Sequence, residues 1–118
     1  MTAASPLRLA SVADLIGRPA CDGGGEPLGR VEDLVVDLDA DRLAYALLSF
    51  GGFVRADRLF AMPVRLLSVD AGDTVTVRVD RTMLKNAPAI APGGRAILAD
   101  RRWGLKVYSY FGYTPYWE

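Results

Sequence analysis

Histidine is absent from the 118-residue chain, and cysteine occurs once, at position 21. Without histidine, the chain cannot form Ser-His-Asp or Cys-His catalytic sites or histidine-containing metal sites, and it lacks the commonest general base at neutral pH. Cys21 has neither histidine nor lysine near it in the sequence to activate its thiol, and a lone cysteine excludes an internal disulfide. We therefore expect a protein that is not an enzyme, with a buried structural thiol, in a reducing cytoplasm.

Net charge and long apolar runs are also lacking. The 14 basic residues balance the 14 acidic ones, so no global field draws the chain to nucleic acid or anionic lipid, and nucleic acid is an unlikely partner. The longest stretch without a charge, Leu43 to Val54, is too short to span ~30 Å of hydrocarbon. Met1 to Ala10 lacks the apolar run of a signal peptide. We expect no transmembrane segment.

Three apolar runs between Gly24 and Val69 predict a β-meander. In the first, Leu34, Val36 and Leu38 alternate with other residues, which is typical of a strand with one buried face. Asp39 to Asp41 turns the chain. The second run, Leu43 to Phe50, is apolar on both faces and is therefore expected to be central in the sheet. After the Gly51-Gly52 break, Arg58 to Met62 is the expected third strand, which Pro63 ends because it has no N–H to donate.

The remaining elements are short. We expect a helix starting at Ser11-Val12-Ala13-Asp14, an edge strand at Pro19 to Cys21, a β-bulge between Val31 and Leu34, a strand at Thr74 to Val79, a helical turn at Arg81 to Asn86 and a linker at Ala87 to Gly94. The expected core includes Leu34, Val36, Leu47, Val75 and Val77. The predicted fold class is all-β: a small antiparallel barrel of five or six strands, since closure removes exposed sheet edges.

A set of short motifs occurs in order along this region: Gly17-Arg18-Pro19-Ala20, Asp22 followed by glycines, Gly29-Arg30-Val31-Glu32-Asp33, Asp37-Leu38-Asp39, Leu48-Ser49-Phe50-Gly51-Gly52 and Phe60-Ala61-Met62-Pro63. Together, over about residues 10 to 90, they resemble the PRC-barrel family. Its members include the cytoplasmic domain of the photosynthetic reaction-centre H subunit, the C-terminal domain of a ribosome maturation factor, and small stand-alone bacterial proteins. Val64-Arg65 departs from the family, where an aromatic residue often follows the proline.

The C-terminal segment differs from the rest in composition. We expect a PRC-barrel domain at 10–90 and an aromatic extension at 91–118 that packs either on its own barrel or on a partner subunit. Four basic residues, Arg95, Arg101, Arg102 and Lys106, lie among the aromatics. They are expected to meet the acidic surface of residues 22–41, within one chain or between two.

Large aromatic side chains seldom stay exposed, so we expect a homo-oligomer with the extension in its interface. The candidate partner or self-interface residues are Phe50, Phe53, Arg101, Arg102, Trp103, Tyr108, Tyr110, Phe111, Tyr113, Tyr116 and Trp117. Phe50 to Val54 is a candidate contact because it forms an expected turn.

Two ligand motifs fail on their spacing. Asp37, Asp39 and Asp41 open like a calcium loop, but Arg42 and Leu48 replace the glycine and glutamate that such a loop needs. The glycines from Gly24 to Gly29 are not followed by the lysine and serine or threonine of a phosphate loop. We therefore expect no cofactor, no catalytic residues and no metal site, although weak divalent binding by the acidic surface stays open.

These observations favour a non-enzymatic PRC-barrel binding or assembly module, self-associating and with a protein partner. One alternative is an RNA-associated or ribosome-associated factor, which the maturation-factor resemblance implies. It is weakened by the zero net charge. A second alternative is a soluble protein akin to the photosynthetic reaction-centre H subunit, which the other resemblance implies.

Overall fold

The computed structural model describes residues 5–50, 59–69 and 72–118, so the expectations for Phe53, Arg58 and the Gly51-Gly52 break lie outside it. Its strands are β1 (Pro19–Cys21), β2 (Pro27–Asp37), β3 (Arg42–Phe50), β4 (Leu59–Met62), β5 (Leu67–Val69), β6 (Val75–Val77) and β7 (Ala89–Ile90). Its helices are α1 (Val12–Leu15), α2 (Arg81–Leu84) and α3 (Arg101–Tyr110), with 3-10 helices η1 (Val64–Leu66) and η2 (Arg95–Ala99).

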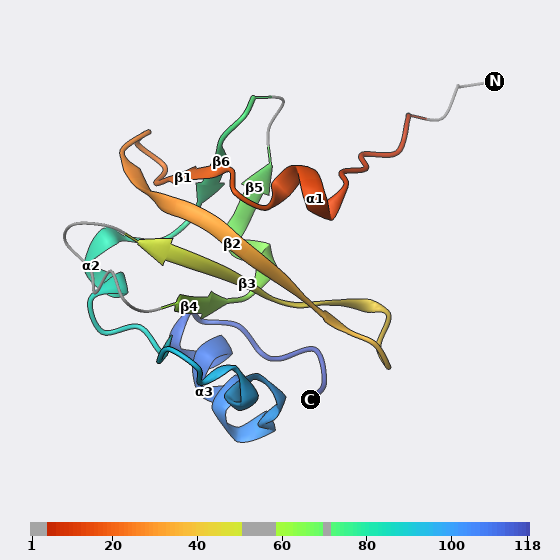
Figure 1. Ribbon diagram of the computed structural model, residues 1–118, viewed down its shortest axis with the longest axis vertical. Helices are drawn as coiled ribbons and strands as arrows, with labels where there is room; N and C mark the ends of the chain where they lie inside the picture. Colours follow the sequence, from red (N-terminus) through yellow and green to blue (C-terminus); the bar gives the residue numbers. More distant parts are fainter. Residues whose placement is uncertain (1–4, 51–58, 70–71) are drawn as a thin grey trace.

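The strands form one sheet in the order β5-β6-β1-β2-β3-β4-β7 (Figure 1). The predicted mostly-sheet architecture is confirmed, but the sheet of the described residues has seven strands rather than five or six, and the predicted antiparallel barrel is wrong in two further respects. The sheet is mixed, because β1 pairs in parallel with β6, and within the described residues its outer strands β5 and β7 do not pair with each other. The expectation that β1 is an edge strand is also wrong, since β2 and β6 flank it.

The long β2–β3 hairpin organises the sheet. Its register shifts between Val31 and Asp33, which confirms the predicted bulge. Gly29 is required at this crossing, because a Cβ there would lie 1.8 Å from the carbonyl oxygen of Ser49. At the far end, Asp37 Oδ1 accepts hydrogen bonds from the backbone N–H groups of Asp39 and Ala40, which holds the predicted turn.

A second register shift, between Val35 and Val36, overturns part of the predicted core. Beyond it the alternation no longer points inward, and the hairpin extends past the packed layers. Val36 is therefore 50% exposed and Leu38 83% exposed, although both were expected to face the core. The tip of the hairpin carries apolar side chains into solvent.

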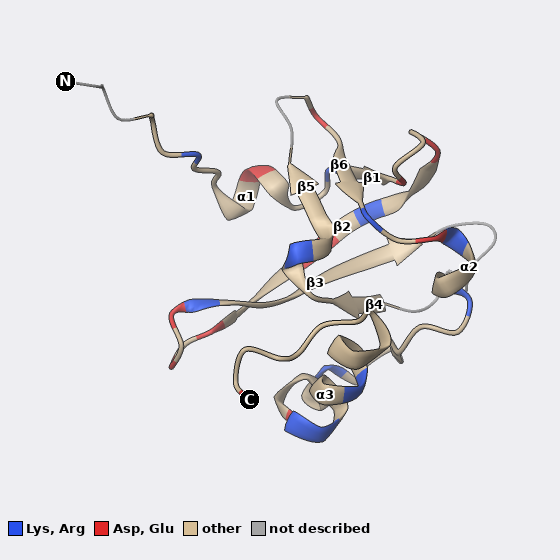
Figure 2. Cartoon of the chain, turned by 180° about the vertical axis from the view of Figure 1, so that it is seen from behind, with Lys and Arg blue, Asp and Glu red and all other residues tan. Residues whose placement is uncertain are grey.

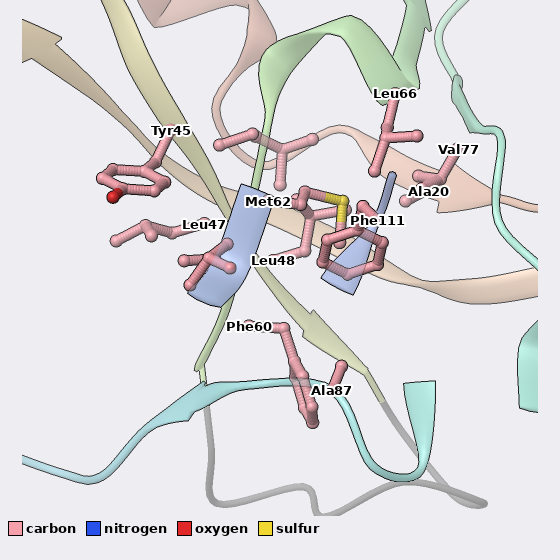
Figure 3. Close-up of a cluster of buried hydrophobic side chains, with 14 of the residues drawn as sticks. Ala20, Tyr45, Leu47, Leu48, Phe60, Met62, Leu66, Val77, Ala87 and Phe111 are labelled. Carbon is pink, nitrogen blue, oxygen red and sulfur yellow. The ribbon is translucent and has the colours of Figure 1, made fainter. Parts of the chain in front are cut away.

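The core is built on β3, as predicted for a central strand. Ala44 to Leu48 are all buried, and Leu34, Leu47, Val75 and Val77 are buried as expected. Figure 3 shows side chains of β3 and β4 in one cluster with Phe111 of the C-terminal extension. The extension thus contributes to the same core as the sheet.

Three local expectations need correction. The predicted linker contains strand β7, which pairs with β4, and buries Ala87 and Ile90. Cys21 is half-buried rather than buried, with its Sγ 3.9 Å from Thr76 Oγ1. Ser11 precedes α1, but its side chain makes no capping hydrogen bond. The helical turn at α2 is confirmed, and the Asp80 side chain caps it by accepting from the Thr82 N–H.

Leu47→Ala is expected to lower the free energy of unfolding by about 2–5 kcal/mol, because it removes a fully buried side chain and leaves a cavity. The matched control is Leu38→Ala, the same change at an exposed position, for which we expect a loss within about 0.5 kcal/mol. Denaturant unfolding of both variants measures the difference. Equal losses would contradict the assignment of these two positions.

Candidate interaction surface

The C-terminal extension forms a helix that lies on its own chain's sheet. Asp100 caps α3, since its Oδ1 accepts hydrogen bonds from the backbone N–H groups of Arg102 at 2.8 Å and Trp103 at 3.0 Å. The helix buries Gly104, Val107 and Tyr108, which share one face at a spacing of three and four residues. Of the two expected arrangements, the structure therefore has packing on the chain's own barrel domain.

Two tyrosine hydroxyls fasten α3 to the rest of the fold. Tyr108 donates to the backbone carbonyl of Ala44 in β3 at 2.6 Å, and Tyr110 donates to that of Met83 in α2 at 2.5 Å. Burial raises the pKa of Tyr108. These bonds satisfy polar groups that the helix covers and fix its direction across the sheet.

Gly104 allows α3 to approach β3 closely. A Cβ at this position would lie 2.3 Å from the hydroxyl oxygen of Tyr45 and 2.7 Å from ring carbons of Trp117. Tyr45 is only 2% exposed, and burial raises the pKa of its hydroxyl well above the ordinary value. A glycine inside a helix costs roughly 0.5–1 kcal/mol relative to alanine, so the close contact accounts for its presence here.

The end of the chain is held to the hairpin by Tyr116. Its hydroxyl donates to Asp37 Oδ2, and its ring stacks on the Arg42 guanidinium, whose carbon lies 4.1 Å from the ring centroid. The Tyr116 hydrogen bond, followed by the backbone N–H of Ala40, lowers the pKa of Asp37. Burial and then the bond to Asp37 raise the pKa of Tyr116. We call this set of three side chains, Tyr116, Asp37 and Arg42, the tail clasp.

A groove of about 520 Å³ lies between the hairpin and the extension, within the size range of ligand sites. Val36 to Asp39 form one wall, and Arg95 with Leu98 to Arg101 form the other. Tyr45 and Ala44 lie at its base, and Tyr116 and Trp117 close one side. The hairpin wall thus carries carboxylates, and the other wall carries two guanidinium groups together with the Asp100 carboxylate that caps α3.

An ion pair joins η2 to strand β2, the elements on the two sides of the groove. Arg95 Nη1 lies 2.7 Å from Asp33 Oδ2, with both side chains partly exposed. For Arg95, this confirms within one chain the expectation that the basic residues of the extension meet the acidic surface of residues 22–41; Arg102 and Lys106 form no such ion pair within the described residues. Arg101 also faces this surface, and its charge contributes to the lowered pKa of Asp37.

The predicted interface residues fall into three groups. Phe50, Tyr108 and Phe111 are buried in the chain's own core, so they do not lie on a surface. Arg101 and Arg102 are exposed on α3. The half-buried aromatics that cover the sheet are Trp103, Tyr110, Tyr113, Tyr116 and Trp117. Phe53 lies outside the described residues.

Sequence reasoning missed the exposed apolar side chains on the outside of this region. Val36 and Leu38 were assigned to the core by simple alternation, and Leu105, which is 41% exposed on α3, was not considered. The signal for Leu105 was available, because Asp100 caps a helix whose buried positions at Gly104, Val107 and Tyr108 place residue 105 at the edge of the buried face, roughly 100° around the helix from Gly104.

The described residues contain no group of three acidic or cysteine side chains placed to hold a metal ion. Among the helices of the described ranges, none is long and apolar enough to cross a membrane. Neither observation adds a site to the groove.

The chain belongs to the PRC-barrel family. The model of the PRC-barrel domain matches residues 9–84, which cover α1 through α2 and include most of the sheet. The family resemblance seen in the sequence motifs is therefore confirmed, and it indicates a domain of the protein-interaction or assembly type. No curated protein matches the chain. Strand β7, η2 and α3 lie beyond the matched residues.

Gly104→Ala is expected to lower the free energy of unfolding by about 1–3 kcal/mol, because the new methyl group overlaps the Tyr45 hydroxyl and the Trp117 ring. The matched control is Gly23→Ala, where a Cβ would meet nothing within 4 Å. We expect the control to change stability by less than about 0.5 kcal/mol. Thermal and denaturant unfolding measure both variants, and a neutral Gly104→Ala would contradict the close packing of α3.

The tail clasp is expected to weaken in acid. The folded state lowers the pKa of Asp37 below its ordinary value of 3.8, so its contribution is present above that pH and is lost as the pH falls through the lowered value. Tyr116→Phe should therefore lower the denaturant midpoint at pH 7, and the difference from the parent chain should shrink below about pH 4.

The control for the clasp is Tyr113→Phe, whose hydroxyl forms no hydrogen bond with the described residues although Arg65 lies over its ring at 5.9 Å. Its difference from the parent chain should not depend on pH between 7 and about 2, a range that includes the acid values below about pH 4 where the tail clasp is expected to weaken. A Tyr116→Phe effect of constant size over that range would show that the hydrogen bond to Asp37 does not stabilise the fold.

Proposed function

We propose that this protein is a non-enzymatic PRC-barrel module that binds a protein partner and assembles with further copies of itself. The observation that carries the proposal is the set of exposed apolar side chains around the charged groove. Leu38 and Val36 lie on one wall and Leu105 lies on the outer face of α3, beyond the other wall. An apolar centre within a polar rim is the arrangement of many protein–protein interfaces.

The position of the extension supports this proposal. Its largest aromatic residues are used within the chain, where they pack on β3 and on one another. The surface left for a partner is therefore the outside of the extension together with the hairpin, and it has a defined shape because Gly104, Tyr108 and the tail clasp hold the extension in place. Such preorganisation lowers the entropic cost of binding.

The test compares capture by the full chain with capture by Leu38→Asp, using native cell extract and mass spectrometry. Leu38→Asp should lose the captured protein, because a charge would be buried in the contact. The matched control is Leu9→Asp, since Leu9 is exposed to the same extent, 83%, but lies on the N-terminal segment. If Leu38→Asp captures as much protein as Leu9→Asp, the assignment of this surface is wrong.

The identity of the captured species separates the alternatives. Loss of capture after ribonuclease treatment would contradict a protein partner and favour the RNA-associated factor. Photosynthetic membrane subunits in the capture would favour the reaction-centre alternative. Turnover by the purified chain of any substrate identified through the capture would contradict a non-enzymatic role.

A further inference from the structure

The outward face of α3 is basic around an apolar centre. Arg102, Lys106 and Ser109 are exposed on the side of the helix opposite Gly104 and Tyr108, and Leu105 is exposed at the edge of that side. Within the described ranges, Arg102 and Lys106 form no ion pair. Arg101 lies at the margin of this face and lines the groove. We call Arg102, Leu105 and Lys106 the basic face.

The positions of Arg101 and Arg102 do not stabilise α3. Arg101 and Arg102 occupy the first turn of α3, which contains no acidic residue. The N-terminal end of a helix carries a partial positive charge, so a cation there is unfavourable by about 0.3–1 kcal/mol. Arg102 has no compensating ion pair in the described part of the chain. The charge of Arg102 is therefore left exposed at the surface, where it is available to a partner.

The tip of the β2–β3 hairpin has the opposite charge around a similar centre. Asp39 and Asp41 are exposed there, and the neighbouring Leu38 is 83% exposed. The neighbouring Arg42 is engaged with Tyr116 in the tail clasp. Figure 2 shows acidic residues at the end of the hairpin and basic residues on α3, in separate parts of the molecule. We call Leu38, Asp39 and Asp41 the acidic tip.

We propose that the acidic tip of one copy docks on the basic face of a second copy. This inference rests on the proposed function and names its self-association contact. Each surface has one exposed leucine flanked by two like charges, and the charges of the two surfaces are opposite. Opposite charges steer two surfaces together and fix their register, while the leucines leave water. Two copies joined in this way keep their own extensions in place.

The contact is heterologous, because it joins two different surfaces. In a joined pair, one copy keeps a free basic face and the other keeps a free tip, so association continues to a closed ring or an open chain of copies. Because both surfaces are exposed, their attraction is screened by salt, with a Debye length of about 30 Å at 0.01 M and about 3 Å at 1 M. The average mass should rise with protein concentration and fall with added salt.

The experiment exchanges the charges of the two surfaces in the full chain. The tip variant carries Asp39→Lys and Asp41→Asn, since asparagine tolerates the positive φ of 54° at position 41. The face variant carries Arg102→Glu and Lys106→Glu, and the glutamate at 102 suits the first turn of α3. Circular dichroism and thermal unfolding check that both variants fold. Sedimentation velocity then measures the parent chain, each variant and their mixture at low salt.

The parent chain should form concentration-dependent oligomers, and each variant alone should remain a monomer because its two surfaces carry the same sign. The equimolar mixture should regain association, since the reversed tip now matches the reversed face and the two unmodified surfaces still match each other. Association that survives in either variant alone, or that the mixture fails to restore, would overturn the contact.

A parent chain that stays monomeric at every concentration would also overturn it. That result removes the self-assembly part of the proposed function, and it leaves the protein-binding part standing if Leu38→Asp still abolishes capture of a different protein. Retained capture by Leu38→Asp would contradict the proposed surface even if the parent chain associates. Failure of the self-association contact and failure of the proposed binding surface therefore give different experimental results.

Discussion

The close contact between α3 and strand β3 is the constraint on which the rest of the structure depends. Gly104 lets the helix backbone reach the Tyr45 hydroxyl and the Trp117 ring, where any side chain would overlap both. Because the helix lies so near the strand, Tyr108 can donate to the Ala44 carbonyl, and the last residues can return to the hairpin. The groove, its basic wall and the outward face of α3 all take their position from this one contact.

Although the net charge is zero, the fold places acidic and basic residues in different parts of the molecule. Acidic residues collect at the end of the hairpin and basic residues on α3 (Figure 2). Some of these charges are used within the chain, as in the ion pair of Arg95 with Asp33 and the stacking of Arg42 on Tyr116. The other exposed charges give the surface one acidic region and one basic region. This distribution affects the choice of partner more than the net charge does.

Much of the sheet could be predicted from sequence, and the failures have different causes. The bulge near Val31, the central strand β3 and the turn after Asp37 follow from local patterns of apolar residues, glycine and aspartate. Val36 was misplaced because a second register shift changes which residues face the core, and Leu38 was misplaced because strand β2 ends at Asp37 and Leu38 lies in the turn. Helix α3 was not predicted, although the Asp100 cap and the spacing of the buried Gly104, Val107 and Tyr108 are local signals for a helix.

The sequence by itself determined the family, the order of most strands and the absence of histidine chemistry, since these depend on residue identity and on short spacings. Only the tertiary structure decided that β6 pairs in parallel with β1, that the sheet stays open among the described residues and that the aromatic extension covers its own sheet. The physical reason is that each of these outcomes joins segments far apart in the chain. Their pairing depends on which apolar surfaces remain to be buried after the local elements form. The local periodicity of the sequence does not specify those long-range contacts.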